Sequence, residues 1–186
     1  MPRSRSESGR LTPRIGEVGR RAHHLPFDVE ASLNGEGPVL AALDLIAAGV
    51  PEEEAARSLT WRDFEGFCAQ LLRANGYSVR GNVYLSRPRA QIDLVATGPL
   101  FVISLDCKHW RRAPSPSALE GFALAQLRRS RLFRRSLADP KPIISAVLSF
   151  NESEGSFVGG VAIVPLRTLR NFLETVESYS ELLEMS

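Results

Sequence analysis

The sequence predicts an α/β fold in which helices flank a mixed central sheet, and three observations lead to it. Residues 91–108 form two apolar segments joined by a tight turn at Thr97-Gly98-Pro99, which is typical of a β-hairpin. Amphipathic helical patterns lie before and after this hairpin, at 60–74 and 117–137. Two further apolar segments, 143–150 and 158–164, add strands to the same sheet. The expected core order is therefore α-β-β-β-α-β.

The totals fit one globular domain with an ample core and a small appendage. The chain has 186 residues, of which 44% are hydrophobic, and its net charge is +2. No apolar run approaches the ~20 residues that span a bilayer, and the Arg-rich start lacks the apolar core of a secretory signal. Cys68 and Cys107 are expected to be buried thiols, and the three histidines show no zinc-ligand spacing. These features predict an intracellular protein.

Residues 1–34 are expected to form a basic arm, rich in Arg, Ser, Gly and Pro and without periodicity. Such a segment is most simply a solvated, flexible tail. It also suits an arm that follows a phosphate backbone, and the two interpretations are compatible.

Residues 35–59 are expected to form a small helical accessory segment with two short helices. Gly49 ends the first helix, and Pro51 opens the second in the first turn, where proline is tolerated. A helix, a glycine turn and a helix also describe a DNA-reading helix-turn-helix. However, Glu52, Glu53 and Glu54 at the start of the second helix would repel phosphates. We therefore favour a packing role.

The helix from Thr60 begins with a capping box formed by Thr60 and Asp63. Glu65 lies at the edge of its apolar stripe, where a single glutamate is normally just solvated. Asn75-Gly76 ends the helix, and the alternating segment 77–85 follows as a strand. Residues 60–186 are taken as one domain.

Charged residues interrupt both strands of the hairpin. On the first strand Asp93 and Val95 are expected on one face, opposite Ile92, Leu94 and Ala96. On the second, Ser104, Asp106 and Lys108 are expected to share a face. Two carboxylates at one end of a sheet are costly unless a cation or hydrogen bonds compensate, and a divalent metal would do so. The alternative is an ordinary cross-strand ion pair between Asp93 and Lys108.

A second capping box, Ser117 with Glu120, is expected to open the long helix that runs to about Leu137. Gln126 is placed on the helix face that packs on the sheet. Between Lys108 and Arg135 only Glu120 is acidic, so this segment is a local cationic excess that favours a polyanionic partner. After the last strand, Leu166–Leu183 is expected to form one amphipathic C-terminal helix.

This arrangement resembles the PD-(D/E)xK nuclease superfamily, and within it the Mrr-like restriction endonucleases and the archaeal Holliday junction resolvases. The resemblance covers residues 60 to about 165. It depends on the following motifs: Phe64-Glu65, Asn75-Gly76-Tyr77, Ile92-Asp93 and Asp106-Cys107-Lys108. Ile92 replaces the proline of the motif, and Asp106 stands where Glu is commoner. The resemblance implies a restriction-endonuclease-like core in a prokaryotic, archaeal cytoplasmic protein.

The resemblance also implies a metal-dependent DNA endonuclease of restriction or repair type, using Mg²⁺ with Mn²⁺ as a substitute. Asp93 and Asp106 would be direct metal ligands, with the Cys107 carbonyl an additional one. Lys108 would orient the attacking water, and Glu65 would hold a metal-bound water or a second metal. Gln126 matches a glutamine of the superfamily that orients the water or the scissile phosphate.

The cationic segment would bind the DNA backbone through Arg111, Arg112, Arg128 and Arg129. Trp110 is either a stacking platform for DNA or simple packing under the helix. Two alternatives remain: a non-catalytic DNA-binding protein on a nuclease-like fold, and a Holliday junction resolvase or RNA-directed nuclease. Retention of both acids and the lysine argues against a pure binder. A homodimer is expected by analogy, because cutting both strands needs two sites.

Overall fold

The computed structural model describes residues 37–110, 112–138, 141–150 and 154–179. The expected basic arm, residues 1–34, lies outside this part of the chain. The elements, in order, are α1 (Pro38–Ala47), α2 (Glu52–Ala55), α3 (Trp61–Ala74), β1 (Ser78–Ser86), β2 (Arg89–Thr97), β3 (Val102–Lys108), α4 (Pro116–Arg135), β4 (Ile143–Ser149), β5 (Ser156–Val158), β6 (Val161–Pro165) and α5 (Leu169–Thr175). Short 3₁₀ turns, Leu166–Thr168 and Val176–Tyr179, flank α5.

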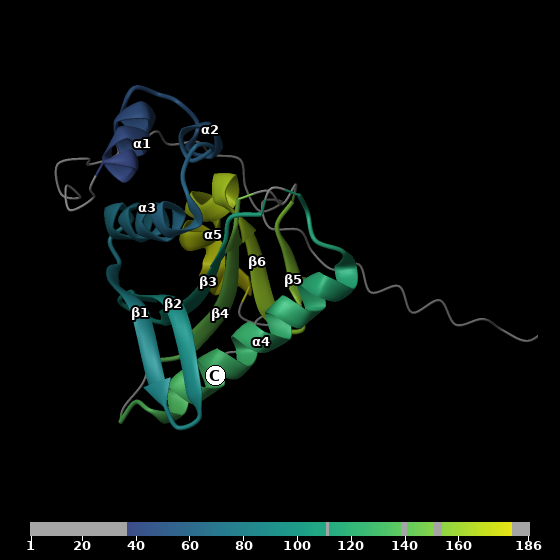
Figure 1. Cartoon of the computed structure of the whole chain (residues 1–186). Helices are drawn as coiled ribbons and strands as arrows, with labels where there is room; N and C mark the ends of the chain where they lie inside the picture. Colours follow the sequence, from purple (N-terminus) through teal and green to yellow (C-terminus); the bar gives the residue numbers. More distant parts are fainter. Residues whose placement is uncertain (1–36, 111, 139–140, 151–153, 180–186) are drawn as a thin grey trace, which may run out of the picture.

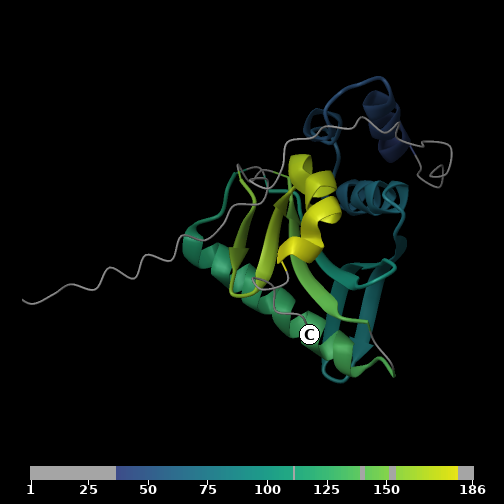
Figure 2. The ribbon, with the colours of Figure 1, turned by 180° about the vertical axis from the view of Figure 1, so that it is seen from behind.

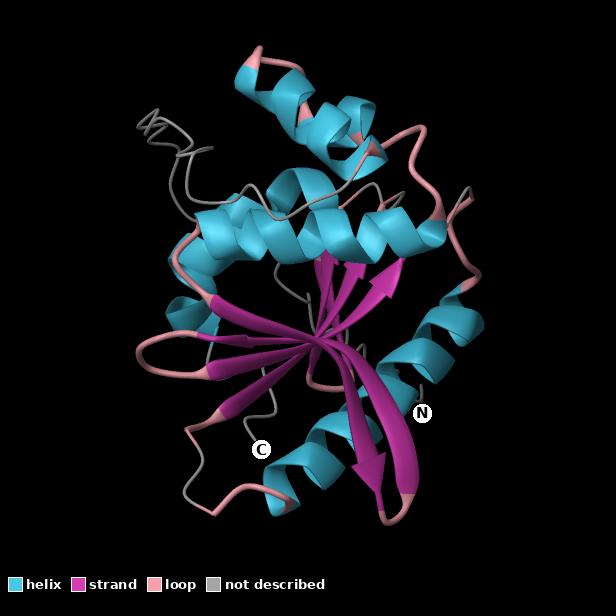
Figure 3. Cartoon of the chain, turned by 60° about the vertical axis from the view of Figure 1, so that its left-hand side comes forward, coloured by secondary structure: helices cyan, strands magenta, loops and turns pink. Residues whose placement is uncertain are grey.

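One six-stranded mixed sheet organises the molecule, in the order β1-β2-β3-β4-β6-β5 (Figures 1 and 3). β1, β2 and β3 form an antiparallel meander, β3, β4 and β6 run parallel, and β5 pairs antiparallel with β6. The crossover from β3 to the parallel β4 passes through α4, as a parallel pair requires. This confirms the α/β, restriction-endonuclease-like architecture.

Helices cover both faces of the sheet. α4 crosses one face diagonally (Figure 1), and α5 lies on the opposite face, seen from behind in Figure 2. α3 packs on that same opposite face over the β1–β3 meander, and α1 packs on α3. In the part of the chain that the structure describes, no helix is long and apolar enough to cross a membrane.

The two faces of β3 carry different chemistry. Ile103, Leu105 and Cys107 point to the α3 side and join the main core. Ser104 and Asp106, equally buried, alternate with them and point to the α4 side. The predicted faces of this strand are confirmed. The buried polar residues of β3 therefore all face α4.

The predicted faces of β2 are wrong at Ile92. This residue packs with Val95 and with Phe133 of α4, rather than with Leu94 and Ala96. The β2–β3 ladder ends at the Leu94–Leu105 pair, while β2 stays paired with β1 beyond it. Asn82, in β1 near Asp93, has φ 50°, a left-handed conformation. The β1–β2 hairpin therefore bends at Asp93 and turns its outer half toward α4 (Figure 3).

The capping box at the start of α3 is confirmed: the Asp63 backbone N–H donates to Thr60 Oγ1 at 3.3 Å, and the Thr60 N–H donates to Asp63 Oδ2 at 3.2 Å. The predicted second box, Ser117 with Glu120, is wrong. Ser115 caps α4 instead, accepting from the Ala118 N–H at 3.3 Å. The helix begins two residues earlier because Pro116 occupies its first turn, where a missing N–H costs nothing.

The expected strand 158–164 is a hairpin, β5 and β6. Gly159 and Gly160 have φ 55° and 79°, which suits a tight turn between antiparallel strands. The expected single helix 166–183 is also wrong over the described residues. It is α5 flanked by two 3₁₀ turns, and its last predicted residues lie outside the described part of the chain.

Candidate active site

The site forms where β3 ends between α3 and α4. Asp106 and Lys108 lie at the C-terminal end of β3, on the side that faces α4, and the Asp106 side chain is only 3% exposed. Lys108, one-quarter exposed, reaches over the ring of Phe122 on α4, with its Nζ 5.6 Å from the ring centroid. A buried carboxylate therefore lies beside a partly solvated ammonium group.

Asp93 reaches the same place from the bend in β2. The Cys107 backbone N–H donates to Asp93 Oδ2 at 2.8 Å, so this carboxylate replaces the ladder partner that β3 loses beyond Leu105. The hydrogen bond fixes one oxygen of Asp93 at the end of β3. The bend thus has a direct use, because it brings the two predicted acidic ligands together.

Glu65 comes to the site from the other side, on the second turn of α3. It lines a groove of about 390 Å³ that runs along α3, past Arg62 and Arg73, to Gly81 and Asn82 on β1. Burial, followed by the negative charges of Asp93 and Asp106, raises the pKa of Glu65 above its ordinary value of 4.5, while Lys108 and Arg62 oppose the rise. The acids of α3, β2 and β3 therefore share one electrostatic environment.

Burial also raises the pKa of Asp93 above its ordinary value of 3.8. The hydrogen bond from Cys107 and the charge of Lys108 lower it, but the charge of Asp106 and a side-chain hydrogen bond with that carboxyl raise it. A neighbouring negative charge raises the pKa of a carboxyl because it disfavours the ionised form.

Asp106 is held by two cations. Lys108 Nζ lies 2.9 Å from its Oδ2, and Arg129 Nη2 lies 3.0 Å from its Oδ1. The alternative considered from sequence, an ion pair between Asp93 and Lys108, is therefore not what forms. Within the described residues, Asp106 Oδ2 is buried and has no hydrogen-bond partner, since the ion pair with Lys108 lacks hydrogen-bond geometry.

Gln126 is completely buried between α4 and β3, on the sheet-facing side of the helix as expected. Its Nε2 donates to the Ser104 carbonyl at 2.8 Å and lies 3.0 Å from Ser104 Oγ, and its Oε1 accepts from Arg129 Nε at 3.0 Å. These contacts use the whole amide. Gln126 is therefore linked to the site through Arg129, and its role in orienting a water or a phosphate stays a prediction.

The expected DNA-contacting residues differ in their surroundings. Arg112 and Arg128 are exposed, whereas Arg129 points inward to Asp106. Trp110 packs against Phe122, with ring centroids 5.2 Å apart, and joins the apolar cluster under α4. Arg111 lies outside the described residues.

Cys107 contacts the acids of the site through its backbone N–H, which donates to Asp93 Oδ2, and not through its thiol. The contact with the Cys68 thiol, and burial, raise the pKa of Cys107 well above its ordinary value of 9.0. A thiol that stays protonated is a poor metal ligand. The thiol faces the core on the α3 side.

The donor set fits a cation such as Mg²⁺. Within the described residues, no three His, Cys, Asp or Glu side chains gather closely enough to hold a metal by themselves. Mg²⁺ does not require this, because proteins commonly bind it through one or two carboxylates, with substrate phosphate and water completing its shell. Asp93 and Asp106 supply two carboxylates, and the buried Oδ2 of Asp106, which lies beside the Lys108 ammonium group without a hydrogen bond, is an oxygen suited to a cation.

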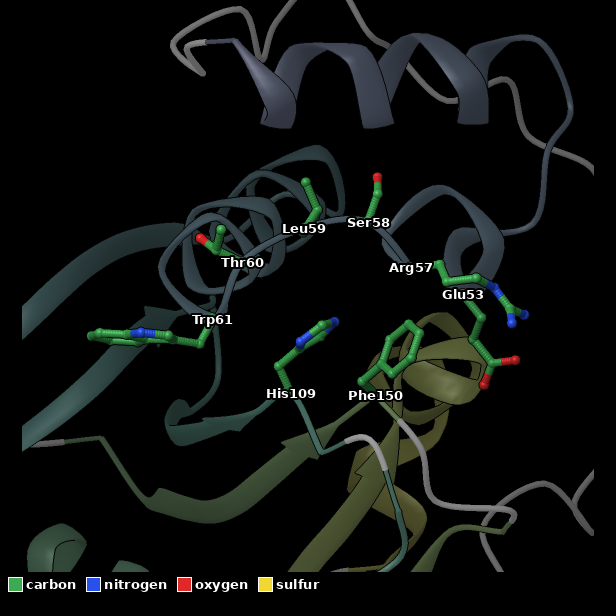
Figure 4. Close-up of a pocket in the computed structure, with 8 residues that line it drawn as sticks. All are labelled: Glu53, Arg57, Ser58, Leu59, Thr60, Trp61, His109 and Phe150. Atoms are coloured by element: carbon green, nitrogen blue, oxygen red, sulfur yellow. The ribbon is translucent and has the colours of Figure 1, made fainter.

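A larger cleft, about 780 Å³, borders the site without containing its acids. Trp61, one turn before Glu65, and His109, next to Lys108, belong to its lining. Figure 4 shows the His109 ring beside Phe150, while the Trp61 indole points away from both. Trp61 is 59% exposed and carries the guanidinium of Arg62 5.1 Å above its ring. The cleft thus gives solvent access along the edge of the site.

Sequence reasoning missed Ser104 and the inward contact of Arg129. Both had a signal. Ser104 shares a strand face with Asp106, and Arg129 follows Gln126 by three residues, which places both on one side of a helix. Because the arginines of α4 were treated as one basic face, the exposed Arg128 was not separated from Arg129, which pairs with Asp106.

Residues 56–131 match the Mrr_cat family model, described as restriction endonuclease. The matched segment contains Glu65, Asp93, Asp106, Lys108 and Gln126, and it ends within α4. The match confirms the resemblance to Mrr-like PD-(D/E)xK nucleases that the motifs indicated. A search of curated proteins found no match to the chain.

Proposed function

We propose that this chain, given its match to the restriction endonucleases, is a divalent-metal-dependent endonuclease that hydrolyses phosphodiester bonds in DNA. The match supports a nuclease. The observation that carries the proposal is the convergence of Glu65, Asp93, Asp106 and Lys108 at the end of β3. Their electrostatic coupling is recorded in the raised pKa values of Glu65 and Asp93. Such coupling between acids is typical of sites that bind a cation.

Asp93 and Asp106, with the Cys107 carbonyl, are the proposed ligands of Mg²⁺ or Mn²⁺. When bound, such a cation lowers the pKa of a water and offsets negative charge at the phosphorus. Asp93 is oriented for this role by the Cys107 N–H, which donates to its Oδ2. Asp106 is oriented by its burial under α4.

Lys108 is proposed to orient the attacking water and to offset charge in the transition state. Its ammonium group is partly exposed, and contact with the ring of Phe122 restricts its position. Glu65, half-buried at the edge of the groove along α3, would accept a hydrogen bond from a water at the cation or help to hold a second cation.

The proposed DNA contacts use the exposed side of α4 and the segment before it. Arg112 and Arg128 are exposed there, and Arg111 is included from sequence. Phosphate contacts of this kind give affinity without sequence preference. Trp110 as a stacking platform stays a prediction, because its ring is largely engaged with Phe122.

Cleavage of a panel of nucleic acids with Mg²⁺ or Mn²⁺ tests the proposal. The panel contains linear duplex, methylated duplex, splayed fork, four-way junction, single-stranded DNA and RNA. The preferred substrate separates restriction from junction resolution, repair and RNA cleavage. Metal-independent binding without any cutting would instead support the non-catalytic DNA-binding scaffold.

Asp106→Asn is expected to lower metal-dependent cleavage by roughly 100-fold or more, because it removes a ligand and a charge while keeping the side-chain volume. Cleavage rates at saturating metal, with circular dichroism to check folding, measure this. Glu120→Gln is the matched control, since it removes an exposed acid of α4 away from the site. A folded Asp106→Asn variant with the wild-type rate would refute the site assignment.

A further inference from the structure

Arg129 points into the molecule, whereas Arg128, Arg131 and Arg135 of the same helix are exposed. Its Nη2 lies 3.0 Å from Asp106 Oδ1, and its Nε donates to Gln126 Oε1 at 3.0 Å. The side chain is still 25% exposed, so it is not sealed from solvent. A guanidinium has five donors in a rigid fork, and these two contacts leave donors available.

Gln126 determines where this guanidinium lies. The Ser104 carbonyl can only accept a hydrogen bond and Arg129 Nε can only donate one, so the two contacts fix the orientation of the amide from both ends. Ser104 lies two residues before Asp106 on the same face of β3. The chain Ser104–Gln126–Arg129–Asp106 is therefore a closed loop of contacts between β3 and α4.

The charges around Asp106 are finely balanced. Glu65, Asp93 and Asp106 face three cationic groups, of which Lys108 and Arg129 contact Asp106 and Arg62 acts on Glu65. A divalent cation held by Asp106 would share that carboxylate with Arg129 and Lys108, and their positive charges would oppose it at short range. Lys108 has a second contact with the ring of Phe122, whereas the second contact of Arg129 is a hydrogen bond to Gln126, which would keep the guanidinium at the site when it leaves Asp106.

We propose that Arg129 and the divalent cation compete for Asp106, and that the arginine released from Asp106 while still held by Gln126 binds the phosphate undergoing cleavage. This inference rests on the proposed nuclease function and deepens it. Gln126 is then a positioning residue, and Arg129 connects metal binding to substrate binding. A planar fork is well suited to the second task, because it pairs with phosphate oxygens in a bidentate manner.

Metal binding to the full chain without DNA, measured by calorimetric titration with Mn²⁺, tests the competition directly. Arg129→Gln is expected to bind Mn²⁺ about fivefold more tightly or better, because the competing charge is gone. A residue with a merely structural role would weaken metal binding on removal, or leave it unchanged. Arg128→Gln, the exposed neighbour on the same helix, is the matched control and should keep the wild-type metal affinity.

Single-turnover cleavage at saturating Mn²⁺ tests the phosphate contact. Arg129→Gln should cut at least about tenfold more slowly despite its tighter metal binding. Arg129→Lys, which keeps the charge but not the fork, should bind metal nearly as weakly as wild type and recover only part of the rate. Thermal melts of each variant show that it is folded.

Unchanged or weaker metal binding in a folded Arg129→Gln variant overturns the competition, and a wild-type cleavage rate at saturating metal overturns the phosphate contact. Both outcomes differ from a failure of the proposed function. In that case the wild-type chain would cut no member of the nucleic acid panel, or Asp106→Asn would bind Mn²⁺ like the wild type.

Discussion

At the scale of single residues, the negative charges of Glu65, Asp93 and Asp106 repel one another, and a bound cation would reduce this repulsion. The pKa values of Glu65 and Asp93 are raised above their ordinary 4.5 and 3.8, first by burial and then by neighbouring carboxylates. A group with a raised folded-state pKa contributes stability below its unfolded pKa and loses it as the pH rises through the folded value. Ionisation of these acids at neutral pH therefore destabilises the fold.

We accordingly predict that the stabilisation by Mg²⁺ grows as the pH rises above these ordinary values toward neutrality. Protons compete with the cation for Glu65 and Asp93 at low pH, and they leave as the pH rises. Melting temperatures with and without Mg²⁺ across a pH series measure this effect. A metal-induced shift that stays constant or shrinks with rising pH would contradict it, and Asp106→Asn should flatten the profile.

The chemistry of single residues could be predicted from sequence where it depended on local pattern. Asp93, Asp106 and Lys108 were identified by strand alternation, and the structure does bring them together. The pairing of Lys108 with Asp106 instead of Asp93 could not be foreseen, because it depends on the bend in β2 and on Arg129 arriving from α4. Long-range geometry of this kind leaves no periodic signal.

At the scale of elements, the β2–β3 turn shows how closely α3, the sheet and the site are connected. A Cβ at Gly98 would lie 2.7 Å from Cε1 of Tyr77, the residue between α3 and β1. Tyr77 packs on Phe101, with ring centroids 6.4 Å apart, so a shift of Tyr77 would disturb this contact. The Gly98 carbonyl also accepts from Lys141 Nζ at 2.8 Å.

Gly98→Ala is therefore expected to lower the free energy of unfolding by about 1–3 kcal/mol through overpacking. Gly121→Ala is the matched control, because a Cβ there, within α4, meets no atom within 4 Å. It should raise the stability by about 0.5–1 kcal/mol through helix propensity. Urea denaturation of both variants checks the pair, and a stabilised Gly98→Ala would contradict the overpacking.

Helix and strand boundaries were predictable only where one local signal dominated. The Thr60–Asp63 box is confirmed because both of its reciprocal hydrogen bonds form. Ser117 with Glu120 fits the same pattern, but Pro116 lies in the first turn of α4 and Ser115 caps the helix. The Gly159-Gly160 pair is a hairpin signal that was overlooked within an apolar run.

At the scale of the whole molecule, exposed arginines lie on α4 and in the segment before it, while Asp106 lies beneath that helix. Arg112 and Arg128 are exposed, whereas Asp106 is buried under the same helix. A polyanion would therefore meet the arginines before it comes close to the carboxylates. This order removes the repulsion that an open acidic site would exert on phosphates.

The double variant Arg112→Ala/Arg128→Ala is expected to weaken duplex binding and to reduce the slope of log affinity against log salt by about 1.8, since each lost phosphate contact lowers it by about 0.9. Fluorescence anisotropy at several salt concentrations, with Ca²⁺ or without metal to prevent cutting, measures this. Arg170→Ala, on α5 at the opposite face, is the control. An unchanged slope would count against the outer face of α4 as the DNA contact.

The contact between Cys68 and Cys107 has a consequence for how the integrity of this site can be followed. The two cysteines are the only ones in the chain, and both are buried, one on the helix that carries Glu65 and the other between Asp106 and Lys108. Alkylating reagents attack thiolates, and the high pKa of Cys107 keeps that form scarce while α3 and β3 stay together. Modification of Cys107 is therefore expected to need these elements to separate. The alkylation rate of Cys107 then measures how often the acidic site opens between α3 and β3.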